Sequence, residues 1–154
     1  MSLDRGGALA AALLYEGYAL YPYRASSLKN RKRFDIGVLF PRDWPGAHGA
    51  EASAMRTECV VRVTGPAPTA RVTIRFLHLV ERSEGDAPPW HEATERQVDV
   101  PCPPLAEPAS RRQTDFDFPA AETFAGTSRR RRERIAGRVG VAVERDSADV
   151  MRLA

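Results

Sequence analysis

The chain has 154 residues, of which 43% are hydrophobic and 28% are charged, and its formal net charge is only +3. This length can bury a core and the composition excludes wholesale disorder, so we expect one domain spanning residues 1–154. The longest apolar runs fall short of the roughly 20 residues that a membrane span needs, and a signal peptide is not recognisable. We therefore expect a cytoplasmic protein without a membrane span.

The first part of the expected domain, residues 3–42, begins with a helix. Three leucines recur near one face of residues 3–14, which is the pattern of an amphipathic helix. Pro22 prevents the helix from continuing, and the chain before it becomes extended. Residues 34–40 are β-branched and aromatic, which predicts a strand that ends at Pro41.

The remaining residues, 54–154, form a β-rich body in this prediction. Residues 57–64 and 70–82 each have the composition of a strand, and a turn rich in Gly and Pro separates them. The second segment alternates apolar and polar side chains as a half-buried strand does. We expect these two strands to pair as a hairpin. His78 lies within the alternation, so we expect a structural role for it rather than a ligand role.

Further strands are predicted at 92–100, 114–118 and 135–143, with residues 105–113 as a polar linker. A last alternation begins at 150–153, where the sequence stops. Two alternatives follow for this segment. It is a short edge strand, or the chain is incomplete and the strand's partner lies in missing sequence or in another protein.

These elements together predict a mainly β fold, with α+β character at the N-terminus. Strands spaced 10 to 20 residues apart and joined by connections rich in Pro and Gly favour an antiparallel β-sandwich or an open barrel with one N-terminal helix. Gly137 and Gly140 should loosen or bend the strand in which they lie.

The cysteines and tryptophans favour structural roles. Cys59 and Cys102 lie in or beside predicted strands, so we expect buried thiols, with a redox pair or a thiolate ligand as the alternative. Neither a CxxC pair nor a histidine pair accompanies them, and we expect no metal site and no cofactor. Trp44 and Trp90 follow loop residues and are expected to cap the core, with an interface role as the alternative.

Two carboxylates near residue 116 are predicted to face solvent. Asp115 and Asp117 alternate with Phe116 and Phe118, which is typical of a strand with one wet and one dry side. Two carboxylates without further ligands make a poor metal site. Phosphate-binding loops, nucleophile elbows and HExxH motifs are absent from the sequence.

The segment from Tyr15 to Arg42 is the least generic part of the chain and holds all four tyrosines. Tyrosine supplies apolar area with a hydroxyl group and arginine supplies directed donors, so together they suit a protein interface. A buried corner with a solvated rim is the alternative. The predicted partner-binding residues are Tyr15, Tyr18, Tyr21, Tyr23, Arg24, Lys29, Arg31 and Arg33.

A second candidate surface is the run Arg129, Arg130, Arg131 and Arg132, which we expect to form a loop. A solvated loop, a contact for an acidic protein, and a clamp for nucleic acid or anionic lipid are the three interpretations. The alternative function is therefore nucleic-acid or anionic-surface binding through Arg-rich loops. A third hypothesis is an enzyme with a dispersed site around Glu16, Arg24 and His78.

A family resemblance favours one of these functions. The phrases LLYEGYALYPYRASSLKNRKRFDIGVLFPR, TECVVRV and RFLHLVER resemble accessory proteins encoded with nickel–iron uptake hydrogenase genes. The resemblance covers roughly residues 13–82, and the family offers no assigned catalytic residues to carry over. It implies a non-enzymatic accessory or assembly protein whose partner is a hydrogenase subunit or maturation factor. It also implies members longer than this chain.

Overall fold

A computed structural model describes the chain, which divides into two compact units, Met1–Thr57 and Glu58–Ala154. Each unit is considered by itself. The single domain expected over residues 1–154 stays a prediction. The described residues are 3–16, 39–42, 52–65, 68–107 and 109–154.

The first unit contains helix α1 (Leu3–Glu16), which confirms the helix predicted at residues 3–14. Leu9 and Leu13 on this helix are exposed. A backbone hydrogen bond from the amide of Phe40 to the carbonyl of Ala52, 2.9 Å long, joins the unit's other described segments. The strand predicted at 34–40 lies mostly outside the described residues.

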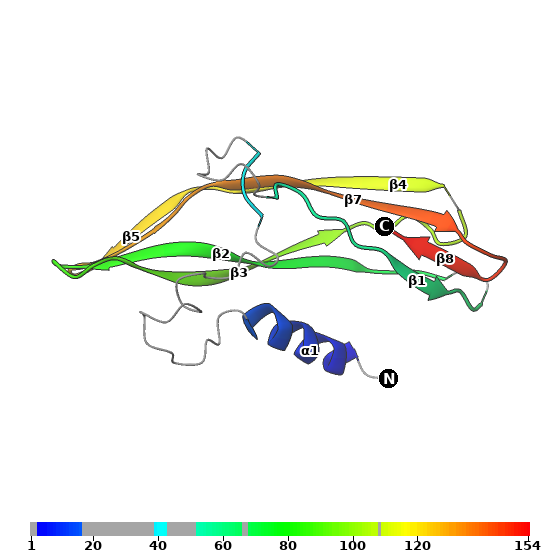
Figure 1. The fold of residues 1–154 in the computed structure, drawn as a ribbon, viewed down its shortest axis with the longest axis horizontal. Helices are drawn as coiled ribbons and strands as arrows, with labels where there is room; N and C mark the ends of the chain where they lie inside the picture. The colour runs from blue at the N-terminus through cyan, green and yellow to red at the C-terminus, as the bar shows by residue number, and fades with distance from the viewer. Residues whose placement is uncertain (1–2, 17–38, 43–51, 66–67, 108) are drawn as a thin grey trace. The chain divides into compact units, whose positions relative to one another are not determined.

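The second unit consists of two antiparallel four-stranded sheets (Figure 1). Sheet A has the order β1-β8-β7-β4 and sheet B has the order β3-β2-β6-β5. The strands of sheet A are β1 (Cys59–Arg62), β8 (Val150–Leu153), β7 (Ile135–Arg145) and β4 (Ser110–Phe118). The strands of sheet B are β3 (Trp90–Val100), β2 (Val72–Glu84), β6 (Ser128–Arg132) and β5 (Ala121–Ala125).

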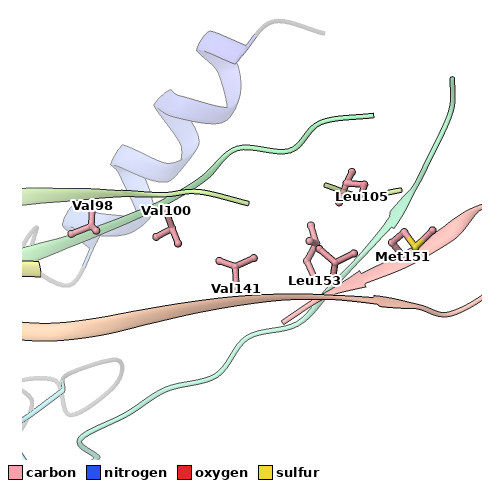
Figure 2. Close-up of a cluster of buried hydrophobic side chains, with 7 residues drawn as sticks. Val98, Val100, Leu105, Val141, Met151 and Leu153 are labelled. Carbon is pink, nitrogen blue, oxygen red and sulfur yellow. The ribbon is translucent and has the colours of Figure 1, made fainter. Parts of the chain in front are cut away.

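A buried apolar cluster joins the two sheets. Alternate residues in the last part of β3, in the second half of β7 and in β8 point into it, as the period of a strand requires. Figure 2 shows the side chains from β3 facing those from β7 and β8. Burying such side chains is the main stabilising contribution in a small domain. The cluster contains Val98, Val100, Leu105, Val141, Val143, Met151 and Leu153.

Three phenylalanine rings extend this core along the sheets. Phe76 on β2 lies 5.7 Å from Phe116 and 5.9 Å from Phe118, both on β4. Because the rings and the cluster combine residues of both sheets, the unit is a β-sandwich. With the N-terminal helix, this confirms the predicted mainly β fold class.

One long hairpin passes from sheet A into sheet B. Strand β4 leads through residues 119–120 into β5, and β6 leads through residues 133–134 into β7. Contacts between the two sheets run from β3 to β4 and β7, and from Phe76 of β2 to the rings of β4. Beyond this crossing, the part of sheet B that contains β5 and β6 is a single layer within the described part of the second unit (Figure 1).

The predicted hairpin of residues 57–64 with 70–82 is wrong. Strand β1 pairs with β8 in sheet A, whereas β2 pairs with β3 and β6 in sheet B. The alternation of apolar residues specifies which side of a strand faces the core, but it does not specify which strand lies beside it. Several strands here satisfy the same alternation, so sequence proximity chose the wrong partner.

Strand β8 is also not an edge strand. It lies between β1 and β7, with Leu153 opposite both Cys59 and Val143. Ala154 exchanges two further backbone hydrogen bonds with Ala142, 2.8 and 3.1 Å long. The last alternation in the sequence therefore belongs to the interior of sheet A.

The strands predicted at 92–100, 114–118 and 135–143 are confirmed, and each is longer than expected. The polar linker predicted at 105–113 is wrong at both ends. Leu105 is buried in the core, and β4 begins at Ser110. Prolines around Leu105 suggested a loop, but a single apolar residue is enough to fix such a segment to the core.

Candidate functional site: an arginine-rich sheet face

One side of sheet B packs on the core. The same side of the sheet is not covered by sheet A in the single-layer part that contains β5 and β6 (Figure 1). Alternation from buried Val98 and Val80 places every second residue of β2, β3 and β6 on this same side, because opposite residues in antiparallel strands share a face. We call this surface the arginine face. Its residues are His78, Arg82, Glu84, Trp90, Glu92, Arg96, Ser128, Arg130 and Arg132.

The outer end of the arginine face is held by a shared carboxylate. Glu92 accepts from Nη1 of Arg82 at 2.9 Å and lies 3.3 Å from Nε of Arg130. The hydrogen bond from Arg82 is the main cause that lowers the pKa of the Glu92 carboxyl. Arg82 also lies over the ring of Trp90, with its Cζ 5.1 Å from the ring centroid. This end is therefore an ordered surface of aromatic and charged groups.

The inner end is built around buried His78, which is 2% exposed. Its Nε2 lies 2.8 Å from the carbonyl oxygen of Glu133, which only accepts, so Nε2 carries the proton. Nδ1 is then free to accept from Nε of Arg96 at 3.4 Å. Burial is the main cause that lowers the pKa of His78, and the charges of Arg96 and Arg132 lower it further. The ring is neutral at pH 7, which confirms the structural role expected for it.

Arg132 differs from its three neighbours in the arginine run. Its Nε is buried and has no hydrogen-bond partner within the part of the chain that the structure describes. In contrast, Arg129 pairs with Glu122, Arg131 pairs with Glu133, and Arg130 pairs with Glu92. An unsatisfied buried N–H is costly, and about 1–3 kcal/mol is typical. Arg132 is thus the one member of the run that has no ion-pair partner among the described carboxylates.

The loop expected for Arg129–Arg132 is wrong, because these residues form strand β6. Arg130 is opposite Thr123 and Arg131 is opposite Glu122 in β5. Neighbouring side chains of a strand point to opposite faces. Two of the four arginines therefore lie on the arginine face and two on the other side of sheet B, so they do not form one clamp.

The structure describes only the backbone of Tyr15, which lies in α1; the other predicted partner-binding residues of the tyrosine-rich segment lie outside the described residues, as does Trp44. The side chain of Glu16 and the whole of Arg24 also lie outside them, so the dispersed enzyme site stays a prediction. The residues concerned in the partner-binding segment are Tyr15, Tyr18, Tyr21, Tyr23, Arg24, Lys29, Arg31 and Arg33.

The solvent exposure of Cys59 and Trp90 contradicts the structural roles predicted for them. Cys59 is exposed rather than buried, because it begins the short strand β1 at the edge of sheet A. Cys102 is half-buried, and burial raises the pKa of its thiol, with Cys59 adding a smaller effect. Trp90 does not cap the core: it is 39% exposed and packs on Arg82. The alternative expectation, an interface role for Trp90, stays a prediction.

The solvated side predicted for Asp115 and Asp117 is confirmed. Asp115 pairs with Arg138 at 2.5 Å and Asp117 with Arg134 at 2.7 Å, and these hydrogen bonds lower the pKa of both carboxyls.

Among the described residues, no group of three or more His, Cys, Asp or Glu side chains is placed to hold a metal ion. The same part of the chain has no helix that is long and apolar enough to span a membrane.

Comparison with known proteins identifies no relative: no family model, no curated protein and no solved structure matches the chain. The function of the arginine face must therefore be argued from its own geometry.

The neutral state of His78 predicts a pH-dependent stability. A histidine whose pKa is lowered by folding stabilises the fold fully above the unfolded value of 6.5, and that contribution is lost as the pH falls below it. We expect the free energy of unfolding to fall between pH 7.5 and 5.5, by at most about 1.4 kcal/mol per pH unit. Urea denaturation at both pH values measures it. The His78→Gln variant should flatten this dependence.

Proposed function

We propose that this chain is a non-enzymatic accessory protein that binds a protein partner through the arginine face. The observation that carries the proposal is Trp90, which is partly exposed and stacked against Arg82 beside a shared carboxylate. Tryptophan and arginine contribute much of the binding energy at protein interfaces, and ordered side chains lose less entropy on binding. Charge favours an acidic partner, since this face carries four arginines and two glutamates.

The same geometry gives little support to catalysis at this face. His78 is the titratable group closest to neutral pH on it, and both of its ring nitrogens are engaged within the protein. A general base needs a free lone pair within reach of the substrate. Here the lone pair of Nδ1 faces Arg96, so a binding role fits the arrangement better.

The proposal takes the partner's identity from the family resemblance of residues 13–82. The partner is a nickel–iron hydrogenase subunit or maturation factor, and the chain acts beside it in the cytoplasm. The tyrosine-rich segment would supply a second contact area. Its test is the double variant Tyr21→Ala with Arg24→Ala, which should weaken partner capture while the protein stays folded.

The decisive test is capture of the hydrogenase subunits by the tagged full chain from cells that express both. Trp90→Ala should reduce the recovered subunits about tenfold or more, because it removes the exposed ring and its contact with Arg82. The matched control is Phe124→Ala, which removes another exposed ring on the opposite face of sheet B. Thermal melts confirm that both variants are folded.

Three outcomes would contradict the proposal. Full recovery by Trp90→Ala, or an equal loss in Phe124→Ala, would remove the arginine face as the contact surface. Recovery of neither hydrogenase subunits nor their maturation factors would remove the hydrogenase connection. Loss of every partner after nuclease treatment would favour nucleic-acid binding instead.

A further inference from the structure

Two cations of the arginine face have no carboxylate partner among the described residues. Arg82 and Arg130 share Glu92, and Arg82 also reaches Glu84 at 3.5 Å. No described carboxylate forms an ion pair with Arg96 or Arg132, and these lie toward the core rather than at the solvated rim. Both side chains are half-buried, and a guanidinium that is partly removed from water without a carboxylate is destabilising.

Both of these arginines lie close to the ring of His78. Nε of Arg96 lies 3.4 Å from His78, and Arg132 precedes the residue whose carbonyl holds the other side of that ring. His78 cannot neutralise them, because an imidazole ring is either neutral or cationic. Arg96 is fixed by the ring of Phe118, with its Cζ 4.9 Å from the ring centroid. The site thus combines an ordered guanidinium with a second one whose Nε–H has no described acceptor.

We propose that Arg96 and Arg132 bind the carboxylate of a glutamate or aspartate side chain from the partner. This inference rests on the proposed function and specifies the chemistry of the partner. The same face already contains one such arrangement, since Glu92 is held between the guanidiniums of Arg82 and Arg130. Guanidinium groups match the planar carboxylate with paired, charge-assisted hydrogen bonds. An incoming carboxylate would repeat this arrangement nearer the core.

Stability measurements separate a ligand-binding arginine from a structural one. Arg132→Met keeps the length of the side chain and removes the unpartnered charge, so the melting temperature should stay equal or rise. Arg131→Met is the control on the opposite face, where the side chain pairs with Glu133. A fall of about 4 °C or more in Arg132→Met alone would show that Arg132 stabilises the fold and would overturn the inference.

Binding is measured by NMR of the arginine Nε–H groups in the full-length ¹⁵N-labelled protein. The probes are N-acetylglutamate N-methylamide, its glutamine counterpart and inorganic phosphate. The glutamate probe should shift the Nε–H signals of Arg132 and Arg96 to saturation, and the glutamine probe should not. These shifts should disappear in Arg132→Met and persist in Arg131→Met.

Two results overturn the carboxylate site: absence of a saturating shift with the glutamate probe, or tighter binding of phosphate. The probe needs no partner, so this outcome is independent of the capture experiment. In that experiment Arg132→Met should recover about tenfold less partner. A partner that is lost by Trp90→Ala but fully retained by Arg132→Met leaves the proposed function intact and removes only the carboxylate site.

Discussion

Shortening the chain to residue 149 is expected to unfold the β-rich unit. Strand β8 would be lost, and it is the only described partner of β1 and one of the two partners of β7. Met151 and Leu153 would leave the core, where they are 3% and 9% exposed. Removing one such side chain costs about 2–5 kcal/mol, and a domain has about 5–15 kcal/mol in total. Near-ultraviolet circular dichroism and urea denaturation measure the result.

The control for this truncation is Arg152→Ala within the same strand. The Arg152 side chain points away from the core and pairs with Asp146 at 2.7 Å. Exposed ion pairs contribute little, so the urea midpoint should stay nearly unchanged. If the truncated protein has the same urea midpoint as the full chain, β8 does not contribute to the stability of sheet A, and the prediction is wrong.

Strand β8 also shows what the sequence could and could not predict about the fold. The alternation at 150–153 correctly indicated a strand, and the core-facing positions are Met151 and Leu153. Its pairing with β1 was not predictable, because the two strands lie more than 80 residues apart in the chain. Local pattern determines which side of a strand is apolar, whereas pairing depends on how all strands fill the core together.

The arginine face was less predictable than the core. Residues 121–125 and 128–132 form a two-residue hairpin around Gly126, whose φ is +60°. That short Gly-containing loop was a usable signal for a hairpin. A hairpin predicted from this loop would have placed Arg129–Arg132 in a strand, with alternate arginines on opposite faces. The meeting of His78, Arg96 and Arg132 was beyond sequence reasoning, since it brings together three strands and depends on how sheet B leaves the core.

Gly137→Ala should destabilise the sandwich, although alanine is normally the better residue in a strand. A Cβ at this position would lie 2.6 Å from Cζ of Phe116 and 2.9 Å from its Cε1. Phe116 is opposite Gly137 in the β4–β7 pair, and its ring packs against Phe76 and Phe118. The ring must therefore move within a packed cluster, which typically costs about 1–3 kcal/mol. Urea denaturation measures this loss.

Gly140→Ala in the same strand is the matched control and should have the opposite sign. The nearest atom to a Cβ there is 3.9 Å away, which is ordinary contact, and φ is not positive. Replacing glycine at such a position stabilises a protein by about 0.4–1 kcal/mol, because the unfolded chain loses freedom. Equal effects of the two substitutions would mean that Phe116 does not require the space above Gly137. Opposite effects would show that Gly137 is retained for the phenylalanine cluster. Through Phe118, that cluster also supports Arg96 at the proposed carboxylate site.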